Sequence, residues 1–275
     1  MSRVKKRRFV GREIKNLLRK ISMKCTRLIS RLDIKGARLI KGVSFEGLRV
    51  VGDPYEAALS YYKGGIDEIF FLDAVASLYG RNNIAETISK VAAAARIPLS
   101  VGGGIRSVAD AEEVFRIGAD KVVVNTAAIR NPELITNLAH VFGSSSIVLS
   151  IEAKRTPQNG WEALTEYGRQ RTDIDAVQWA KQGVDRGAGE VLVSSVDLDG
   201  TRRGFDIDLI RSIAPELPVP VIASGGMGNI DDLIDVVNEG RADAVAVSTV
   251  LHYGEMTVRG IKTLGTDRGL IFAEH

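Results

Sequence analysis

The sequence is poor in the residues that build disulfides and metal sites. Its 275 residues include one cysteine, Cys25, and three histidines, His140, His252 and His275. One cysteine excludes an internal disulfide framework and a cysteine-rich zinc site, and the scattered histidines argue against a histidine-rich metal site. We therefore expect no bound metal, no cofactor, and a protein of the reducing cytoplasm.

Long apolar runs are also absent. The apolar stretches Val91–Ala95 and Ala244–Val247 span only five and four residues, whereas a membrane-spanning helix needs about 20. With 45% apolar and 26% charged residues, the composition is typical of a globular protein rather than a disordered one. A chain of this length matches one (β/α)₈ barrel.

Charge is unevenly distributed. Residues 1–24 hold ten Lys and Arg residues against the single acid Glu13, a local charge of +9, which leaves −6 for the rest. An acidic body does not resemble a nucleic-acid-binding protein. Within Phe9–Ile21 the apolar residues recur at helical spacing opposite a basic face, so this segment is either a surface helix that touches anionic lipid or a partner, or a poorly ordered extension. We expect a domain boundary there, with residues 25–275 forming one barrel.

Eight short apolar runs alternate with amphipathic stretches through the body. Apolar strands separated by helices predict a parallel sheet covered by helices, and eight units predict a closed (β/α)₈ TIM barrel. The predicted strands are Leu28–Ile34, Glu68–Asp73, Leu99–Gly102, Lys121–Asn125, Ile147–Ile151, Glu190–Ser194, Val219–Ala223 and Ala244–Ser248. The predicted helices are Ala57–Lys63, Ile84–Ala94, Ala109–Ile117, Pro132–Phe142, Ala176–Arg186, Asp206–Ile213 and Asp231–Asn238.

The two halves of the body repeat each other. Pro98–Thr126 aligns with Pro220–Thr249 along its whole length, at an offset of 122 and then 123 residues. A similar offset pairs Asp33 with Glu152. A match that keeps register through strand, loop, helix and strand indicates two fused half-barrels.

The residues that follow the strands suggest a site for a doubly phosphorylated molecule, because (β/α)₈ enzymes carry their active sites at the carboxyl ends of the strands. Glycine loops there let backbone N–H groups approach an anion, and small hydroxyls complete the cradle. Asp33, followed by a loop rich in Lys and Gly, and Glu152 are candidates for general acid–base work between the two cradles. The cradle segments are Gly102–Gly104 with Asn125–Thr126, and Gly225–Gly226 with Ser248–Thr249.

A set of motifs spread over the body resembles the cyclase subunit of imidazole glycerol phosphate synthase. They are RLDIKGARLIKGVSFEGLRVVGDP, FFLDAVAS, SVGGGIRS, GADKVVVNTAAIRNPELI, GAGEVLVSSVDLDGTRRGFD and VIASGGMGN. The resemblance runs from about Arg27 to about Thr263. It implies a half-symmetric barrel that converts ammonia and a bis-phosphorylated aminoimidazole carboxamide ribotide into imidazole glycerol phosphate and an aminoimidazole carboxamide ribotide, in histidine biosynthesis.

The resemblance also implies roles for individual residues. Asp33 and Glu152 take the places of the two catalytic residues, and Lys41 that of a loop lysine that closes over the substrate. One phosphate is assigned to Gly104, Asn125 and Thr126. The other is assigned to Asp199, Gly200, Thr201, Gly225, Gly226, Ser248 and Thr249.

The same resemblance implies a partner, because this chain lacks a Cys-His-Glu glutaminase set. The family receives ammonia from a glutaminase subunit docked on the amino-terminal face of the barrel, in a heterodimer, and ammonia then passes along the barrel axis through a charged ring. The ring positions hold Arg27, Glu68, Lys121 and Glu190. They are either an ammonia gate or a structural layer of ion pairs.

Two departures from the family bear on the chemistry. The second catalytic position is aspartate in the family and Glu152 here, and one added methylene displaces a carboxylate by about 1.5 Å. A small residue is usual where Arg31 stands. Since Arg31 and Asp33 share one face of their strand, a charge enters the barrel, and we expect it to pair with Asp73 or Glu152.

These departures leave alternatives to the histidine-pathway reaction. The segments SLYGRN (Ser77–Asn82) and SIEAK (Ser150–Lys154) resemble a divergent group that uses ammonia to make acetamidino groups on surface-polysaccharide sugars. A second alternative is a weak catalyst whose task is to activate a glutaminase partner. The related sugar-phosphate isomerase explains the sequence less well, because the KGVSFEG loop and the charged ring positions resemble those of the cyclase.

Overall fold

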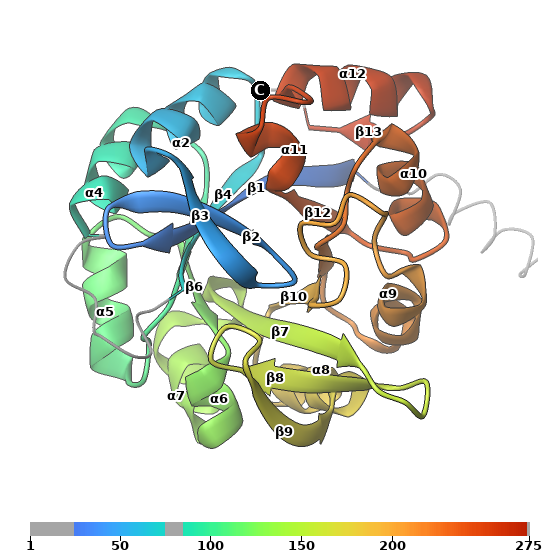
Figure 1. Cartoon of the computed structure of the whole chain (residues 1–275). Coiled ribbons are helices and arrows are strands. Elements are labelled where there is room, and N and C mark those ends of the chain that lie inside the picture. The colour runs from blue at the N-terminus through green and yellow to red at the C-terminus, as the bar shows by residue number, and fades with distance from the viewer. Residues whose placement is uncertain (1–24, 75–84, 274–275) are drawn as a thin grey trace, which may run out of the picture.

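Eight parallel strands form a closed barrel in the computed structural model, which describes residues 25–74 and 85–273 (Figure 1). In their order around the ring the strands are β1 (Cys25–Lys35), β4 (Glu68–Asp73), β5 (Leu99–Gly102), β6 (Lys121–Val124), β7 (Ile147–Arg155), β10 (Glu190–Ser195), β11 (Val221–Ser224) and β12 (Ala244–Val247). The ring closes because β12 pairs with β1 and β10 pairs with β7. The predicted barrel is confirmed, and each predicted strand overlaps one of these eight.

Helices cover the outside of the ring (Figure 1). The longer ones are α2 (Pro54–Lys63), α4 (Ala85–Ala94), α5 (Val108–Arg116), α7 (Glu133–Phe142), α8 (Ala176–Asp185), α9 (Ile207–Ile213), α10 (Ile230–Asn238) and α12 (Val258–Asp267). Asp53, Ser107 and Asp175 start three of them by accepting a backbone N–H of the first turn. The seven predicted helices are present, whereas α12 and the short α6 (Thr126–Arg130) and α11 (Thr249–His252) were not predicted.

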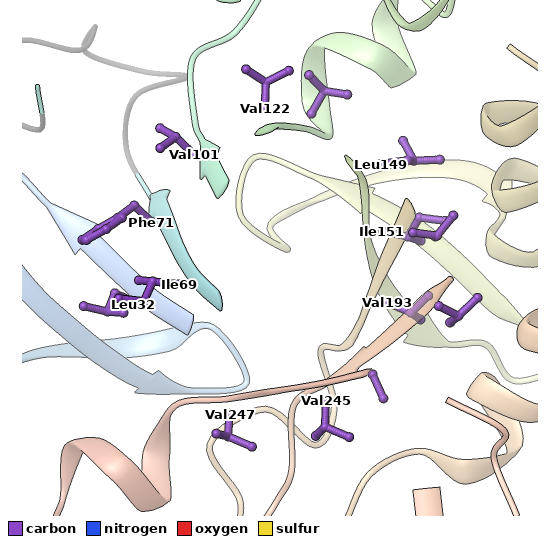
Figure 2. Close-up of a cluster of buried hydrophobic side chains, with 14 of the residues drawn as sticks. Leu32, Ile69, Phe71, Val101, Val122, Leu149, Ile151, Val193, Val245 and Val247 are labelled. Atoms are coloured by element: carbon purple, nitrogen blue, oxygen red, sulfur yellow. The ribbon is translucent and has the colours of Figure 1, made fainter. Parts of the chain in front are cut away.

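The outward faces of the barrel strands are mainly apolar, and the middle layer of their inward faces is apolar as well. The side chains labelled in Figure 2, such as Phe71, Leu149 and Val245, lie around the outside of the ring and pack against the helices. Residues of the opposite face, such as Ile29 and Leu192, are fully buried inside the barrel. Two-sided burial is why these strands read as continuous apolar runs in the sequence.

Two antiparallel hairpins extend from the barrel, one from each half (Figure 1). The first is β2 (Arg38–Val43) with β3 (Glu46–Gly52), and the second is β8 (Trp161–Thr165) with β9 (Gln170–Asp175). The expectation of a loop after Asp33 is therefore wrong, since β2 pairs with the end of β1. These equivalent hairpins are the structural counterpart of the half-barrel repeat.

The end of the chain packs beside the start of the barrel. Strand β13 (Ile271–Phe272) pairs with Cys25 and Thr26 of β1. The predicted basic helix in residues 1–24 and the segment Ser77–Asn82 lie outside the described residues. None of the helices in residues 25–74 and 85–273 combines the length and apolar character needed to cross a membrane.

Candidate active site

The two predicted acid–base residues lie at the carboxyl ends of opposite barrel strands. Asp33 is near the end of β1 and Glu152 is in β7, and both are buried. Strand β1 points Arg27, Ile29, Arg31 and Asp33 to one face. Along this face the strand passes first through a ring of charged side chains at the floor of the barrel, then through an apolar layer, and then into the candidate active site.

Arg31 spans the barrel interior from β1 to the opposite strands. Its Nε and Nη2 lie 3.0 and 2.9 Å from Asp33 Oδ1, while Nη1 donates to Ser194 Oγ at 2.8 Å and to Ser224 Oγ at 3.4 Å. The guanidinium also lies 5.1 Å from the ring centroid of Phe45. The expectation that Arg31 pairs with Asp73 or Glu152 is wrong. Asp33, two residues along the same strand face, is closer.

The ion pair explains how a cation is accommodated in the barrel. Burial alone would lower the pKa of Arg31, but the surrounding negative charges, Asp33 first, outweigh burial and raise it. Arg31 is therefore always charged. Asp33 Oδ2 makes no hydrogen bond in the described part of the chain and lies 3.8 Å from Lys41 Nζ.

Glu152 is in a different electrostatic environment from Asp33. Its Oε2 accepts a hydrogen bond from the Gly168 backbone N–H at 2.7 Å, at the tip of the second hairpin. Burial raises the pKa of Glu152 to about 7, against the opposing effects of the Arg31 charge and the Gly168 hydrogen bond. The site thus holds one ion-paired carboxylate and one carboxyl that exchanges its proton near neutral pH.

The first predicted phosphate cradle lines a cavity of about 290 Å³ that also includes Arg31 and Glu152. Gly104, Asn125 and Thr126 are in its wall. Asn125 Oδ1 has no hydrogen-bond partner among the described residues, although Nδ2 donates to the Leu164 carbonyl oxygen. The cavity therefore brings the first cradle and Glu152 together, as predicted.

The second predicted cradle is covered by the first hairpin. Lys41 Nζ lies 2.9 and 2.7 Å from the two carboxylate oxygens of Asp199, and the Ser44 N–H donates to the Asp199 carbonyl oxygen. A Cβ added to Gly200 would come within 2.3 Å of the Gly42 carbonyl oxygen, so only glycine allows this approach. Lys41 is thus placed over the second cradle.

The remaining predicted residues of this cradle lie at the ends of β10, β11 and β12. Gly226 has φ +115°, and its carbonyl oxygen accepts the Gly204 N–H, which holds the loop against its neighbour. Thr201 Oγ1 donates to the Leu198 carbonyl oxygen. The others, Gly225, Ser248 and Thr249, flank the ends of β11 and β12.

The four predicted ring residues form a closed circuit of ion pairs. Arg27 Nη1 and Nη2 lie 2.8 Å from Glu68 Oε2 and 3.1 Å from Glu190 Oε1. Lys121 Nζ lies 3.1 Å from each of the same two glutamates, and Ser100 Oγ donates to Glu68 Oε1 at 2.6 Å. The geometry confirms that these side chains meet. A gate for ammonia is one use of such a ring.

His252 connects the second cradle to the catalytic strand and was not predicted. Its Nε2 lies 3.1 Å from the Arg31 carbonyl oxygen and its Nδ1 2.8 Å from the Tyr61 hydroxyl. Because a carbonyl only accepts, Nε2 carries the hydrogen and Nδ1 accepts from Tyr61. Burial, aided by the Lys41 charge, lowers the pKa of His252 to about 4, so the ring is neutral.

Carboxylates are numerous, but they are not grouped as ligands. In residues 25–74 and 85–273 no three His, Cys, Asp or Glu side chains form a group that could hold a metal ion.

Comparison with known proteins places this site in a family. Residues 27–257 match the family described as histidine biosynthesis protein. The chain is 55% identical to imidazole glycerol phosphate synthase subunit HisF of Legionella pneumophila over 184 residues, which cover 67% of this chain and 87% of that protein. The chain belongs to the HisF family. A HisF subunit from Symbiobacterium thermophilum is 46% identical over 220 residues, 80% of this chain and 87% of that protein.

The family predicted from the sequence motifs is therefore confirmed, as is the class of enzyme. Relative to the HisF pattern expected from the sequence, Arg31 is the departure with the largest structural effect, because it pairs directly with Asp33.

Tyr167 is a second residue of the candidate site that the sequence analysis missed. It lines the same cavity as Glu152, at the tip of the second hairpin. One signal could have found it: Tyr167 follows Phe45 by 122 residues, the offset that relates the two glycine loops.

Proposed function

We propose that the chain is an ammonia-dependent cyclase that acts on a bis-phosphorylated aminoimidazole carboxamide ribotide and produces imidazole glycerol phosphate in the reducing cytoplasm. One observation supports this most directly: two buried carboxyl groups, Asp33 and Glu152, lie on opposite barrel strands between two glycine-lined cradles. Membership of the HisF family supports the same reaction.

The two cradles bind the ends of the substrate. At one end Gly104, Asn125 and Thr126 hold a phosphate through backbone N–H groups, an amide and a hydroxyl. At the other end the cradle of Gly200, Gly226 and their neighbours holds the second phosphate. When the substrate enters, the Lys41 ammonium leaves Asp199 and binds that phosphate.

Glu152 and Asp33 divide the proton transfers. Imidazole formation incorporates the ammonia nitrogen, which loses protons while a carbonyl oxygen leaves as water. It also breaks a C–N bond of the substrate, so that the aminoimidazole carboxamide ribotide leaves. Glu152, with a pKa of about 7, can accept one proton and donate another at neutral pH. Asp33, which is ion-paired with Arg31, stabilises the positive charge that develops on the incoming nitrogen.

Ammonia comes from a glutaminase subunit bound at the floor of the barrel. The ring of Arg27, Glu68, Lys121 and Glu190 lies at the amino ends of the strands, below the apolar layer of Ile29 and Leu192. A dry apolar layer passes neutral ammonia more readily than ammonium, because a bare charge is costly to bury.

A second candidate function is favoured by the Arg31–Asp33 ion pair. One oxygen of the Asp33 carboxylate is already engaged by the guanidinium and is less available to a substrate. This is the arrangement expected if the site has moved to another ammonia acceptor, such as a surface sugar, or if the chain mainly activates its glutaminase.

Turnover of the bis-phosphorylated ribotide by the purified chain, with ammonium salt at alkaline pH, separates these functions. The proposal predicts loss of the ribotide and formation of imidazole glycerol phosphate in equal amounts. A folded chain that binds the ribotide without consuming it would support the second candidate.

A further inference from the structure

Tyr167 stands at the meeting point of the two hairpins, over the mouth of the barrel. It is 8% exposed and lines the cavity that contains Arg31, Asn125 and Glu152. Its ring packs edge to face on Phe45 of the first hairpin, with 4.7 Å between ring centroids and an interplanar angle of 85°. The tyrosine is therefore packed between two loops that belong to the two halves of the site.

The backbone at this position is in an unusual conformation. Glu166 and Tyr167 have φ of 54° and 58°, in the left-handed region that residues with a side chain seldom adopt. The next residue, Gly168, donates the hydrogen bond to Glu152. Strain of this kind persists where the surrounding contacts hold the residue in place, and it is concentrated at functional sites.

The hydroxyl of Tyr167 makes no hydrogen bond to any residue in the described part of the chain. The ring of Tyr167 is buried, but its hydroxyl oxygen is accessible from the cavity that the residue lines. The charges that act on this hydroxyl belong to Asp33, Arg31, Asp199 and Glu152. Burial, followed by the Asp33 charge, raises the pKa of Tyr167 well above its ordinary value, so the phenol keeps its proton. It is a hydrogen-bond donor in the wall of the cavity that Arg31 and Glu152 also line.

The hairpins place this donor between the cradles. The first hairpin carries Lys41, which covers the second cradle through Asp199. The second hairpin carries Glu166, whose N–H donates to Thr126 Oγ1 of the first cradle at 3.0 Å. Phe45 and Tyr167 meet between these two contacts. A ligand that reaches from one cradle to the other passes beside the phenol.

We propose that Tyr167 contacts the substrate and determines specificity, by donating a hydrogen bond to a hydroxyl or carbonyl oxygen in the middle of the bis-phosphorylated molecule. The inference rests on the proposed function, because that function supplies a substrate that spans both cradles. Molecules with two phosphates but no oxygen between them would exclude water from this donor without replacing its hydrogen bond, and the site would discriminate against them.

Tyr167→Phe tests the proposal, because it removes one oxygen and keeps the ring that packs on Phe45. Tyr62→Phe is the matched control, since Tyr62 lies in α2 on the outside of the barrel and does not line the cavity. Loss of one neutral donor predicts a fall of about tenfold in kcat/KM for the ribotide with ammonium salt. Tyr62→Phe should change this value less than twofold.

Binding provides a second measurement that is independent of turnover. In Asp33→Asn protein labelled with ¹³Cζ-tyrosine, addition of imidazole glycerol phosphate or the ribotide should shift the resonance that Tyr167→Phe removes. Equal kcat/KM and equal Kd for Tyr167→Phe and the unaltered chain would overturn the role of Tyr167 while leaving the cyclase function in place. Absence of both binding and turnover in the unaltered chain would overturn the cyclase function, and this role with it.

Discussion

Arg31 and Asp33 form a buried ion pair within a single strand, with 2.9 Å between Nη2 and Oδ1. Both side chains are almost completely inaccessible, at 2% and 0% exposure. The guanidinium is also fixed by Ser194 and Ser224 across the barrel. The pair and its two serine contacts therefore join β1 to β10 and β11 across the barrel interior.

Replacing Arg31 by methionine should destabilise the fold strongly. Arg31→Met leaves the Asp33 carboxylate buried without its partner, and breaking one side of a buried pair costs about 3–5 kcal/mol. The free energy of unfolding, measured in urea, should fall by about that amount. The double variant Arg31→Met/Asp33→Asn should recover most of the loss. A decrease below about 1 kcal/mol in the single variant would show that the pair does not hold the barrel together.

The raised pKa of Glu152 predicts how stability depends on pH. The value rises from 4.5 to about 7 on folding, so the folded state binds the proton more tightly. The stabilisation relative to Glu152→Gln is complete below pH 4.5 and is lost as pH rises through 7. From the size of the shift it is about 3 kcal/mol at most. Urea unfolding of both proteins at intervals from pH 4.5 to 8.5 measures this difference, and a flat difference would contradict the buried environment of Glu152.

Shortening Glu152 should impair catalysis. Glu152→Asp withdraws the carboxylate by about 1.5 Å, which breaks the 2.7 Å hydrogen bond from Gly168. A displacement of about 1 Å can cost about 100-fold in rate. We expect kcat with ammonium salt to fall by 10-fold or more, with KM changed less because the cradles remain. Higher activity in Glu152→Asp would indicate instead that this chain has drifted from an aspartate-based enzyme.

The stability that the ring of four charged residues contributes should depend on Glu68 more than on Glu190. Glu68 is 1% exposed and interacts with Arg27, Ser100 and Lys121, whereas Glu190 is 12% exposed. Glu68→Gln should lower the free energy of unfolding by about 2 kcal/mol, and Glu190→Gln by about half as much. Thermal and urea unfolding of the two variants, measured side by side, show which substitution lowers the free energy of unfolding more. The reverse order would mean that the ring is not centred on Glu68.

The barrel and both glycine cradles could be predicted because local patterns determine them. Apolar strands, amphipathic helices and glycine loops repeat at a constant offset, and closure brings the strand ends together. The hairpins could not be predicted in the same way. Ser44 and Phe45, at the first turn, both have positive φ, but they lack the Asn-Gly signature of such turns.

The electrostatic details of the site also depend on information that the sequence does not carry. Arg31 was expected to pair with Asp73 or Glu152. It contacts Asp33, Ser194 and Ser224 instead, because the direction of its side chain and the register of the barrel strands bring these groups together. The repeat offset pairs Tyr167 with Phe45 in the sequence, but only the structure shows that the two rings are in contact. Contacts between distant loops decide such positions.

The central claim is that Asp33 and Glu152 perform the chemistry while the cradles bind the substrate. It is tested most directly by single-turnover measurement of imidazole glycerol phosphate formed from the ribotide and ammonium salt by the unaltered chain, Asp33→Asn and Glu152→Gln. The account predicts one equivalent of product from the unaltered chain, and a rate lower by 100-fold or more in each variant with the Kd for the ribotide changed less than fivefold. Equal rates in all three proteins, or no product from an unaltered chain that binds the ribotide, would contradict it.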